Sequence, residues 1–469
     1  MNNKKVIEVL IFFSILFLGL IIYLTTINIY YKDEYVESSY NQRNSVQETK
    51  IKRGTIYDRN GTILAYSEAD ENMKQRRVYP HGSLYSHVIG YSSSQYGKSL
   101  IEKQYNQDLL GKNNVKSLFG TLFQNTLKDG DNITLTIDHK LQQKAAQLMK
   151  KYKGALVAMD PKSGEILAMV SMPDFDPTEE SLSKNWAELN SSENSPFLTR
   201  ATMGMYPPGS TYKIITSAII LENDLRDKII KDDTGSIHLG DKDISNANGS
   251  VYGDTDLTKG FVKSSNVYYA SMGADIESSL HKDMAERFLL NSKIPFKFPI
   301  SRSKFETSHM GPLTCAIASI GQGKTLMTPL HLALMTSAVA NDGVMPKPYI
   351  VSKVTDGNTL ISRTSASTIA QPISSSTARE IKELMLETVN SGTGTAARIN
   401  GIKVCGKTGT AENEMTTYDE NKTHALFVGF APYDNPEIAV SVILENAGYG
   451  GSVAAPIARE VMKTYFSKK

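Results

Sequence analysis

The stretch "GMYPPGSTYKII", Gly204–Ile215, joins a strong helix stop to a candidate nucleophile and a candidate base. The two prolines and the glycine at 207–209 forbid a helix upstream, because proline lacks an amide hydrogen and restricts the residue before it. From Ser210 onward the apolar residues have helical spacing. The pattern therefore predicts a helix that begins at Ser210, with Lys213 one turn later on the same side.

This placement has a chemical use, but it also has a simpler explanation. Serine attacks only after a base removes its proton, and a helix N-terminus offers backbone N–H groups to a developing oxyanion. Serine is also a good helix cap. The Ser-x-x-Lys spacing recurs at Ser181/Lys184, Ser279/Lys282 and Ser301/Lys304. The motif alone therefore leaves a nucleophile and a cap as alternatives.

Two further motifs favour the nucleophile. The run "VKSSNVYY" carries Ser264 and Asn266, a Ser-x-Asn motif, and "VCGKTGTAE" carries Lys407 in a Lys-Thr-Gly-Thr sequence. Strand-like residues flank Lys407, and Gly409 lets a ligand backbone approach closely. Each motif is common by chance, whereas all three in this order are not.

The three motifs together are similar to the signature of penicillin-binding proteins and serine β-lactamases. Over almost its full length the chain resembles a class B penicillin-binding protein, a monofunctional peptidoglycan D,D-transpeptidase. Outside the active site, "RGTIYDRNGTILA" and "GKSLIEKQYNQDLLG" resemble motifs of that family's N-terminal module. The run "SIGQGKTLMTPLHLA" resembles a helix start in its transpeptidase domain.

The resemblance implies an acyl-transfer site around Ser210. This serine would attack the penultimate D-alanine carbonyl of a stem peptide that ends in D-Ala-D-Ala. Lys213 would be its general base, and burial beside Lys407 would hold it neutral for part of the time. Ser264 would relay a proton to the leaving D-alanine, and Asn266 would hydrogen-bond the amide of the donor peptide.

The resemblance also implies a binding strand. Lys407, Thr408 and Thr410 would hold the terminal carboxylate of the substrate, with Gly409 between them. The backbone N–H groups of Ser210 and Thr410 would form the oxyanion hole. An amine of a neighbouring stem would then take the acyl group, and β-lactam antibiotics would acylate the same serine.

The expected fold class is α/β, a penicillin-binding transpeptidase fold with an antiparallel sheet flanked by helices. Hairpin patterns at 154–171 and 424–444 bracket a mainly helical stretch. We predict a cytoplasmic tail at 1–5, a transmembrane anchor at 6–30, an elongated N-terminal pedestal module at 31–150 and the transpeptidase domain at 151–469.

The N-terminal segment Val6–Ile27 is apolar with one charge, Glu8. Its residues span roughly 33 Å as a helix, enough to cross a membrane. Lys4 and Lys5 precede it and favour a cytoplasmic N-terminus, which places the catalytic domain outside the cell membrane. The anchor itself would contact the membrane lipid. The alternative is a cleaved signal peptide, but no small-x-small site follows the segment.

Composition excludes several classes of function. A net charge of +2 indicates no nucleic-acid partner. Scattered histidines and two cysteines predict no metal site and no cofactor, and leave open whether Cys315 and Cys405 pair. The stretch "ASIGQGKT" resembles a phosphate-binding loop but has Ala318 where the first glycine is required.

Two other functions stay open beside the transpeptidase. One is a catalytically weak penicillin-binding scaffold of a wall-synthesis complex, in which residues 31–150 bind a membrane glycan polymerase. The other is a serine β-lactamase. A faint match to the hydrolytic element of those enzymes, at Glu188, lies before Ser210 rather than after the Ser-x-Asn motif.

Overall fold

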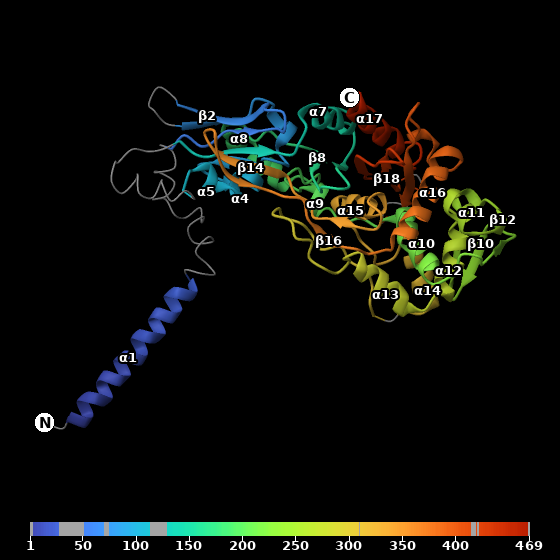
Figure 1. Ribbon diagram of the computed structural model, residues 1–469, viewed down its shortest axis with the longest axis horizontal. Helices are drawn as coiled ribbons and strands as arrows, with labels where there is room; N and C mark the ends of the chain where they lie inside the picture. Colours follow the sequence, from blue (N-terminus) through green and yellow to red (C-terminus); the bar gives the residue numbers. More distant parts are fainter. Residues whose placement is uncertain are drawn as a thin grey trace.

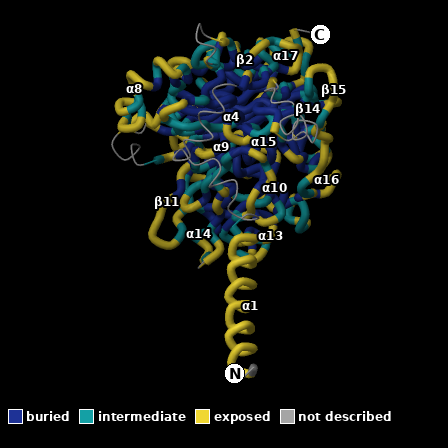
Figure 2. Tube along the Cα trace, turned by 90° about the vertical axis from the view of Figure 1, so that its left-hand side faces the viewer, coloured by how far each residue is buried: buried dark blue, intermediate teal, exposed yellow. Residues whose placement is uncertain are grey.

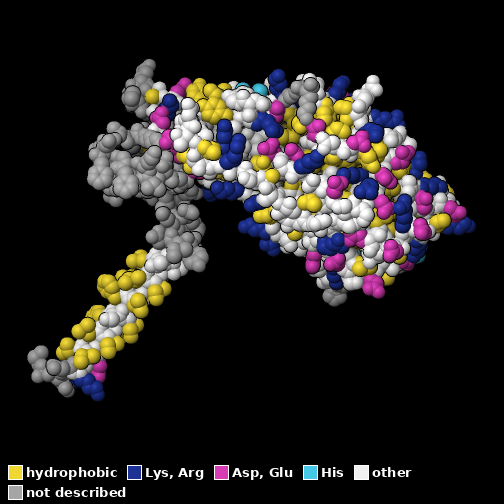
Figure 3. Space-filling view, viewed as in Figure 1, with side chains coloured by type: hydrophobic (Ala, Val, Ile, Leu, Met, Phe, Trp, Pro, Cys, Tyr) yellow, Lys and Arg dark blue, Asp and Glu magenta, His cyan; other side chains and the backbone are white. Residues whose placement is uncertain are grey.

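The computed structural model describes residues 3–27, 51–69, 75–112, 129–308, 310–413, 419 and 422–467. Helix α1 (Asn3–Thr26) stands apart from the body of the protein (Figure 1). It is exposed along its length (Figure 2), and hydrophobic side chains surround it (Figure 3). Its apolar span, Lys4–Thr26, is long enough to cross a membrane. Positions 28–30 of the predicted anchor lie outside the described residues.

The main sheet has five antiparallel strands in the order β17-β18-β19-β7-β8. Their bounds are β7 (Gly154–Met159), β8 (Ile166–Met172), β17 (Cys405–Ala411), β18 (His424–Ala431) and β19 (Ile438–Leu444). The two predicted hairpins are β7–β8 and β18–β19, and they join where β19 pairs with β7. The predicted antiparallel sheet flanked by helices is confirmed.

Helices cover both faces of this sheet. Alternate strand residues point to opposite faces, so Leu156 and Val440 pack in one cluster and Val157 and Val428 in another. On the first face lie α7 (His139–Met149) and α17 (Ala454–Phe466), and on the second lies α15 (Pro329–Ala340) (Figure 1). The domain that contains this sheet also has α8 (Glu179–Ser191), α9 (Arg200–Met203), α10 (Lys213–Glu222), α11 (Leu257–Val262), α12 (Asn266–Asp275), α13 (Ser278–Arg287), α14 (Pro312–Ser319) and α16 (Ser375–Ser391).

A second sheet belongs to the N-terminal module and has the order β15-β14-β6-β1-β2-β3. Its bounds are β1 (Ile56–Tyr57), β2 (Ile63–Ala69), β3 (Gln75–Val78), β6 (Asn132–Leu135), β14 (Val351–Asp356) and β15 (Thr359–Arg363). The predicted strands around Asn60 are β1 and β2, which pair antiparallel. The hairpin β14–β15 comes from much later in the chain, and β14 pairs with β6. The sequence pattern did not predict this return.

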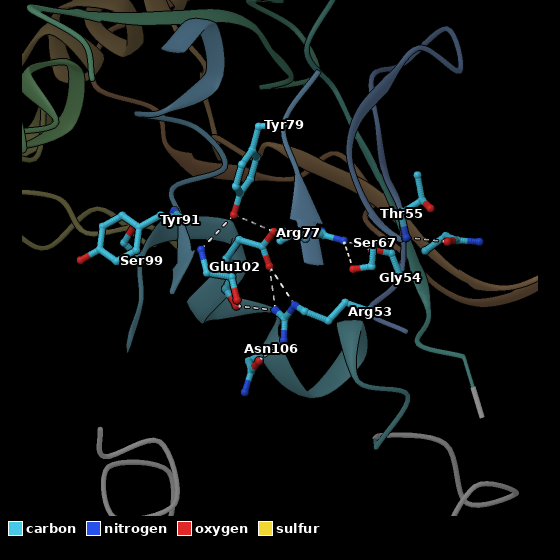
Figure 4. Close-up of polar contacts among 12 residues, drawn as sticks. Arg53, Gly54, Thr55, Ser67, Arg77, Tyr79, Tyr91, Ser99, Glu102 and Asn106 are labelled. Carbon is cyan, nitrogen blue, oxygen red and sulfur yellow. Dashed lines mark hydrogen bonds and ion pairs between the residues drawn. The ribbon is translucent and has the colours of Figure 1, made fainter. Parts of the chain in front are cut away.

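A buried charge cluster lies inside the N-terminal module, beside the short helices α4 (Leu100–Gln104) and α5 (Asn106–Leu109) (Figure 4). The Glu102 carboxylate accepts from Arg53 at 2.7 Å and from Arg77 at 2.6 Å. Burial alone would raise the pKa of Glu102, but the charges and hydrogen bonds of the two arginines hold it below its usual value. The cluster ties the start of the module to its first helix.

Aromatic side chains join this module to the main domain. Tyr96, in the turn region of the hairpin β4 (Ser92–Ser93) and β5 (Gly97–Lys98), stacks on Trp186 of α8 with centroids 3.9 Å apart. Trp186 is the single tryptophan of the chain. Its fluorescence therefore reports on this junction.

Residues 230–255 form a small lobe beside α12 (Figure 1). The lobe consists of β9 (Ile230–Asp232), β10 (Ser236–Leu239), β11 (Lys242–Ser245) and β12 (Gly253–Thr255). These strands pair as β10–β11 and β12–β9. A further small pair is β13 (Met345–Pro346) with β16 (Thr368–Ala370).

Candidate active site

Ser210 lies in a 3-10 turn, η3 (Gly209–Tyr212), and the α-helix α10 begins only at Lys213. The prediction that an α-helix begins at Ser210 is therefore three residues early. The turn is tight because Gly209 has a φ of +51° and donates its N–H to the Gly321 carbonyl at 2.9 Å. Glycine adopts this backbone conformation without the penalty that a side chain brings.

The Ser210 turn packs directly against β17, the strand that carries the Lys-Thr-Gly-Thr sequence. A Cβ at Gly209 would lie 2.6 Å from the Thr410 carbonyl oxygen, and one at Gly409 would lie 2.9 Å from Cγ2 of Thr211. Gly209 therefore permits a close backbone approach that a side chain would block, and Gly409 avoids crowding the Thr211 side chain. Ser210 is held between two residues that contact this strand.

Ser264 links the two lysines of the site. Lys213 Nζ donates to the Ser264 carbonyl at 2.8 Å and to Oδ1 of Asn266 at 2.8 Å, and it lies 3.4 Å from Ser264 Oγ. Lys407 Nζ donates to Ser264 Oγ at 2.8 Å. The predicted Ser-x-Asn motif thus lies between Lys213 and Lys407, with Ser264 in contact with both.

Both lysines are fully buried, and burial is the main reason why their pKa values fall. The pKa of Lys407 falls to about 7. The pKa of Lys213 falls well below its usual value because the charge of Lys407 adds to the effect of burial. Within the described residues, hydroxyl, amide and carbonyl oxygens accept from these ammonium groups, and no carboxylate does.

Each lysine also lies above an aromatic ring. Lys213 Nζ is 5.3 Å from the ring centroid of Tyr269, and Lys407 Nζ is 5.4 Å from that of Phe261. The negative face of such a ring stabilises a nearby cation. These rings therefore oppose the effect of burial on the two lysines.

The Ser210 hydroxyl does not hydrogen-bond to either lysine among the residues that the structure describes. The N–H groups of Lys213 are directed at Ser264 and Asn266 instead. The structure therefore brings the three motifs into one site, but it does not show the Ser210–Lys213 contact that the sequence reasoning expected.

The remaining predicted residues lie on β17. Thr408 shares a hydrogen bond of 2.6 Å with the Thr393 hydroxyl, and Thr410 Oγ1 accepts from the Gly450 N–H at 3.4 Å. The sequence reasoning did not find Thr393. Its only signal was the small-residue run "SGTGTA" at 391–396, which is also typical of a plain loop.

Asn266 and its surroundings show a second omission. Its Nδ2 donates to the Ser245 carbonyl at 2.8 Å, and its backbone N–H donates to Oδ1 of Asn246 at 2.8 Å. Both acceptors come from the small lobe, about twenty residues upstream. No sequence pattern indicated that this loop supports the site, or that Tyr269 and Phe261 lie beneath the lysines.

Comparisons with known proteins identify the family of the chain. Residues 154–463 match the penicillin binding protein transpeptidase domain, and residues 53–133 match the penicillin binding protein A dimerisation domain. The chain is 32% identical over 452 residues to peptidoglycan D,D-transpeptidase PbpA of Mycolicibacterium smegmatis, covering 89% of this chain and 90% of the relative.

Solved structures show the same architecture. The D,D-transpeptidase domain of a peptidoglycan glycosyltransferase from Eggerthella lenta has a TM-score of 0.81 at 34% identity, covering 89% of this chain and 99% of that one. The penicillin G acyl-enzyme complex of penicillin-binding protein A from M. tuberculosis has a TM-score of 0.82 at 30% identity, covering 89% and 100%. This chain therefore belongs to the penicillin-binding protein transpeptidase family.

Proposed function

We propose that the chain is a peptidoglycan D,D-transpeptidase that cross-links stem peptides through an acyl-enzyme on Ser210. One observation carries the proposal. Ser264 Oγ bonds to Lys407 and its carbonyl oxygen to Lys213, while the Ser210 turn packs against the Lys-Thr-Gly-Thr strand. A nucleophile, two basic groups and a strand for the substrate therefore meet in one place.

In the first half of the reaction, Ser210 Oγ attacks the carbonyl carbon of the penultimate D-alanine. The hydroxyl proton passes to neutral Lys213, and the oxyanion accepts hydrogen bonds from the N–H groups of Ser210 and Thr410. The C–N bond then breaks. The leaving D-alanine amine takes the proton from Lys213 through Ser264, which leaves an ester on the serine.

In the second half, an amine of a neighbouring stem attacks the ester carbonyl. Its proton passes back through the same groups to Ser210 Oγ, so the serine is released and an amide cross-link forms. Before acylation, Asn266 orients the donor peptide, and Lys407 with Thr408 and Thr410 binds its terminal carboxylate, which departs with the leaving D-alanine. The carboxylate of a bound donor favours the charged form of Lys407.

The lowered pKa of Lys213 supports its role as the base. A lysine at its usual pKa is protonated at neutral pH and cannot accept a proton. Burial and the charge of Lys407 both favour the neutral form, which fits the requirements of general base catalysis. The same residues account for acylation by β-lactams, in which the leaving amine remains tethered.

We further propose the organisation of the chain in the cell. The segment 6–30 anchors it in the cell membrane, residues 1–5 lie in the cytoplasm, and the module at 31–150 and the domain at 151–469 lie outside. The module would contact a membrane glycan polymerase. Labelling of engineered single cysteines from outside intact cells tests this orientation, since a cysteine added at 1–5 must not react.

A fluorescent penicillin tests the proposed nucleophile. The wild-type protein should be labelled, and Ser210→Ala should not. Ser279→Ala is a matched control, because Ser279 belongs to another Ser-x-x-Lys sequence and is exposed on α13. Labelling of Ser210→Ala, or an unlabelled wild type, would refute the assignment, and a wild type that is labelled but releases no D-alanine from a donor would favour the scaffold.

Turnover separates the enzyme classes. A transpeptidase releases the bound penicillin slowly and liberates D-alanine from a pentapeptide donor when an amine acceptor is supplied. Rapid hydrolysis of the penicillin with no D-alanine release would favour the β-lactamase.

A further inference from the structure

Asn246 makes a concentrated set of hydrogen bonds to the start of α12, the helix that follows the Ser-x-Asn motif. Its Oδ1 accepts from Ser265 Oγ at 3.0 Å, from the Asn266 N–H at 2.8 Å and from the Val267 N–H at 3.0 Å. The first N–H groups of a helix have no partner within it. Asn246 supplies that partner from outside, while Ser265 itself caps the Tyr268 N–H.

Asn246 is in turn fixed by Asp232. Its Nδ2 donates to Oδ2 of Asp232 at 2.6 Å and to the Ser250 carbonyl at 2.8 Å. Asp232 also accepts from the N–H groups of Gly235 at 2.8 Å and Tyr252 at 3.2 Å. Asn246 is 3% exposed and Asp232 is 1% exposed. Each polar atom of the Asn246 side chain is therefore bonded in a buried place, which leaves it one orientation.

This orientation matters because the helix start that it defines carries the acceptors of Lys213. Two of these acceptors belong to Ser264, which has a φ of +58° directly before the capped turn, and the third is Oδ1 of Asn266. The other side of the Asn266 amide is held by the Ser245 carbonyl, the residue before Asn246. The small lobe thus holds Asn266 directly and Ser264 through the neighbouring Ser265, and these two residues supply the hydrogen-bond acceptors of Lys213.

We propose that Asn246, held by Asp232, is a positioning residue for acylation: it sets Ser264 and Asn266, and through them the environment of Lys213. The inference rests on the proposed role of Lys213 as the base. The groups that face Lys213 are Lys407 from β17 and Tyr269 from α12, together with the Ser-x-Asn residues. Asp232 contacts Asn246 and not Lys213, so its effect on Lys213 passes through the orientation of Asn246.

The first test compares Asn246→Ala with Asp243→Asn, an exposed change on the same lobe. The second-order rate constant for acylation by a fluorescent penicillin should fall by about 10–100-fold in Asn246→Ala, as for a lost positioning contact. The acid limb, which is the low-pH side of the pH–rate profile for acylation, should move to higher pH. A displaced turn lets water reach Lys213, and hydration raises the pKa of this lysine. Asp243→Asn should match the wild type in both. A rate loss with an unchanged acid limb would overturn the proposal.

The second test exchanges the two side chains. Asn246→Asp alone places two carboxylates together and should reduce acylation. The double variant Asp232→Asn with Asn246→Asp restores one donor facing one acceptor between positions 232 and 246, although the Tyr252 N–H and the Ser250 carbonyl lose their partners. It should therefore acylate faster than the single variant without reaching the wild-type rate. A folded double variant that stays as slow as the single one would contradict the proposal.

A third variant covers the case in which Asn246→Ala does not fold. Asp232→Asn has one acceptor oxygen instead of two, so it cannot accept from Gly235 as well as from Asn246 and Tyr252, and Asn246 is held less firmly. This variant should show a smaller shift of the same acid limb. An unchanged acid limb in this variant would also overturn the inference. Failure of the proposed function looks different, because Ser210→Ala would then still be labelled whatever residue stands at 246.

Discussion

The N-terminal module and the active site each bury a cluster of charged side chains, and they differ in whether a carboxylate is present. In the module, Glu102 lies between Arg53 and Arg77, within hydrogen-bond distance of both. In the active site the hydrogen-bond acceptors are neutral. Lys213 donates to oxygens of Ser264 and Asn266, and Lys407 donates to Ser264 Oγ and a backbone carbonyl. Burial is similar in the two places.

The difference teaches what a buried charge contributes. The paired cluster keeps its ionised form, as the lowered pKa of Glu102 shows, and it can act as a structural tie. The unpaired lysines lose preference for the charged form, so one of them can accept a proton near neutral pH. Stability is gained in one cluster, and reactivity is gained in the other.

The largest effect is expected from Glu102→Gln, which removes the carboxylate from the paired cluster. Two arginines then stay buried without a counter-charge, and the free energy of unfolding should fall by about 3–5 kcal/mol. The denaturation midpoint read from Trp186 emission measures this, since Trp186 stacks on Tyr96 of the same module.

The matched control is Glu68→Gln, which breaks the exposed Arg76–Glu68 pair on the same sheet. Exposed pairs contribute little, so the midpoint should hardly move. Equal shifts in the two variants would show that the buried cluster is no more important than a surface pair.

The next effect concerns the pH dependence of stability. The pKa of Lys407 is about 7 in the folded protein and 10.5 by its usual value, so the unfolded chain binds more protons between these limits. Stability should therefore rise with pH from about 7 to 10.5, by up to about 1.4 kcal/mol per pH unit. Lys407→Met should be more stable at neutral pH and should flatten this rise, as measured by melting temperature. A steeper rise in the variant would contradict the assignment.

A smaller effect is expected on the base itself. Lys407→Met removes one of the two causes that lower the pKa of Lys213, so that pKa should rise. The acid limb of acylation should then move to higher pH in addition to any loss of rate. Mass spectrometry of the acylated protein across pH measures it, and a limb that moves to lower pH would show that the two lysines do not repel.

The smallest effect should come from the ring beneath Lys213. Tyr269→Leu removes a group that stabilises the cation, so the acid limb should move slightly to lower pH, opposite to Lys407→Met. Tyr269→Phe keeps the ring and loses only the bond to Ser217, so its limb should stay in place while stability falls by about 1 kcal/mol. If the acid limb lies at the same pH in Tyr269→Leu and Tyr269→Phe, the ring has no electrostatic role.

Local patterns predicted much of this molecule. The stop before Ser210, the two hairpins of the main sheet and the apolar helix α1 each depend on neighbours in sequence, and each lies where it was predicted. The short 3-10 turn at Ser210 was not predicted, because it depends on the hydrogen bond of Gly209 with Gly321, which lies far along the chain.

The contributions that the sequence did not predict are all long-range. In the sequence Asn246 is indistinguishable from an ordinary loop residue, and only the structure shows its contacts with Asp232 and the start of α12. Thr393 can be recognised as part of the site only from its hydrogen bond to Thr408. The strand β14 has no local sign of its partner, since Ser352 and Thr134, which hydrogen-bond across β14 and β6, are 218 residues apart. Periodicity reports burial, not the identity of a distant neighbour.

The pairing of β14 with β6 also constrains how the protein is made. A nascent chain presents β6 long before β14 is synthesised, so an unpaired strand edge stays open for much of translation. Such edges pair readily with other chains. Fragments truncated before Val351 should therefore associate with one another or require a chaperone, even though they contain every residue between Met1 and the end of β6.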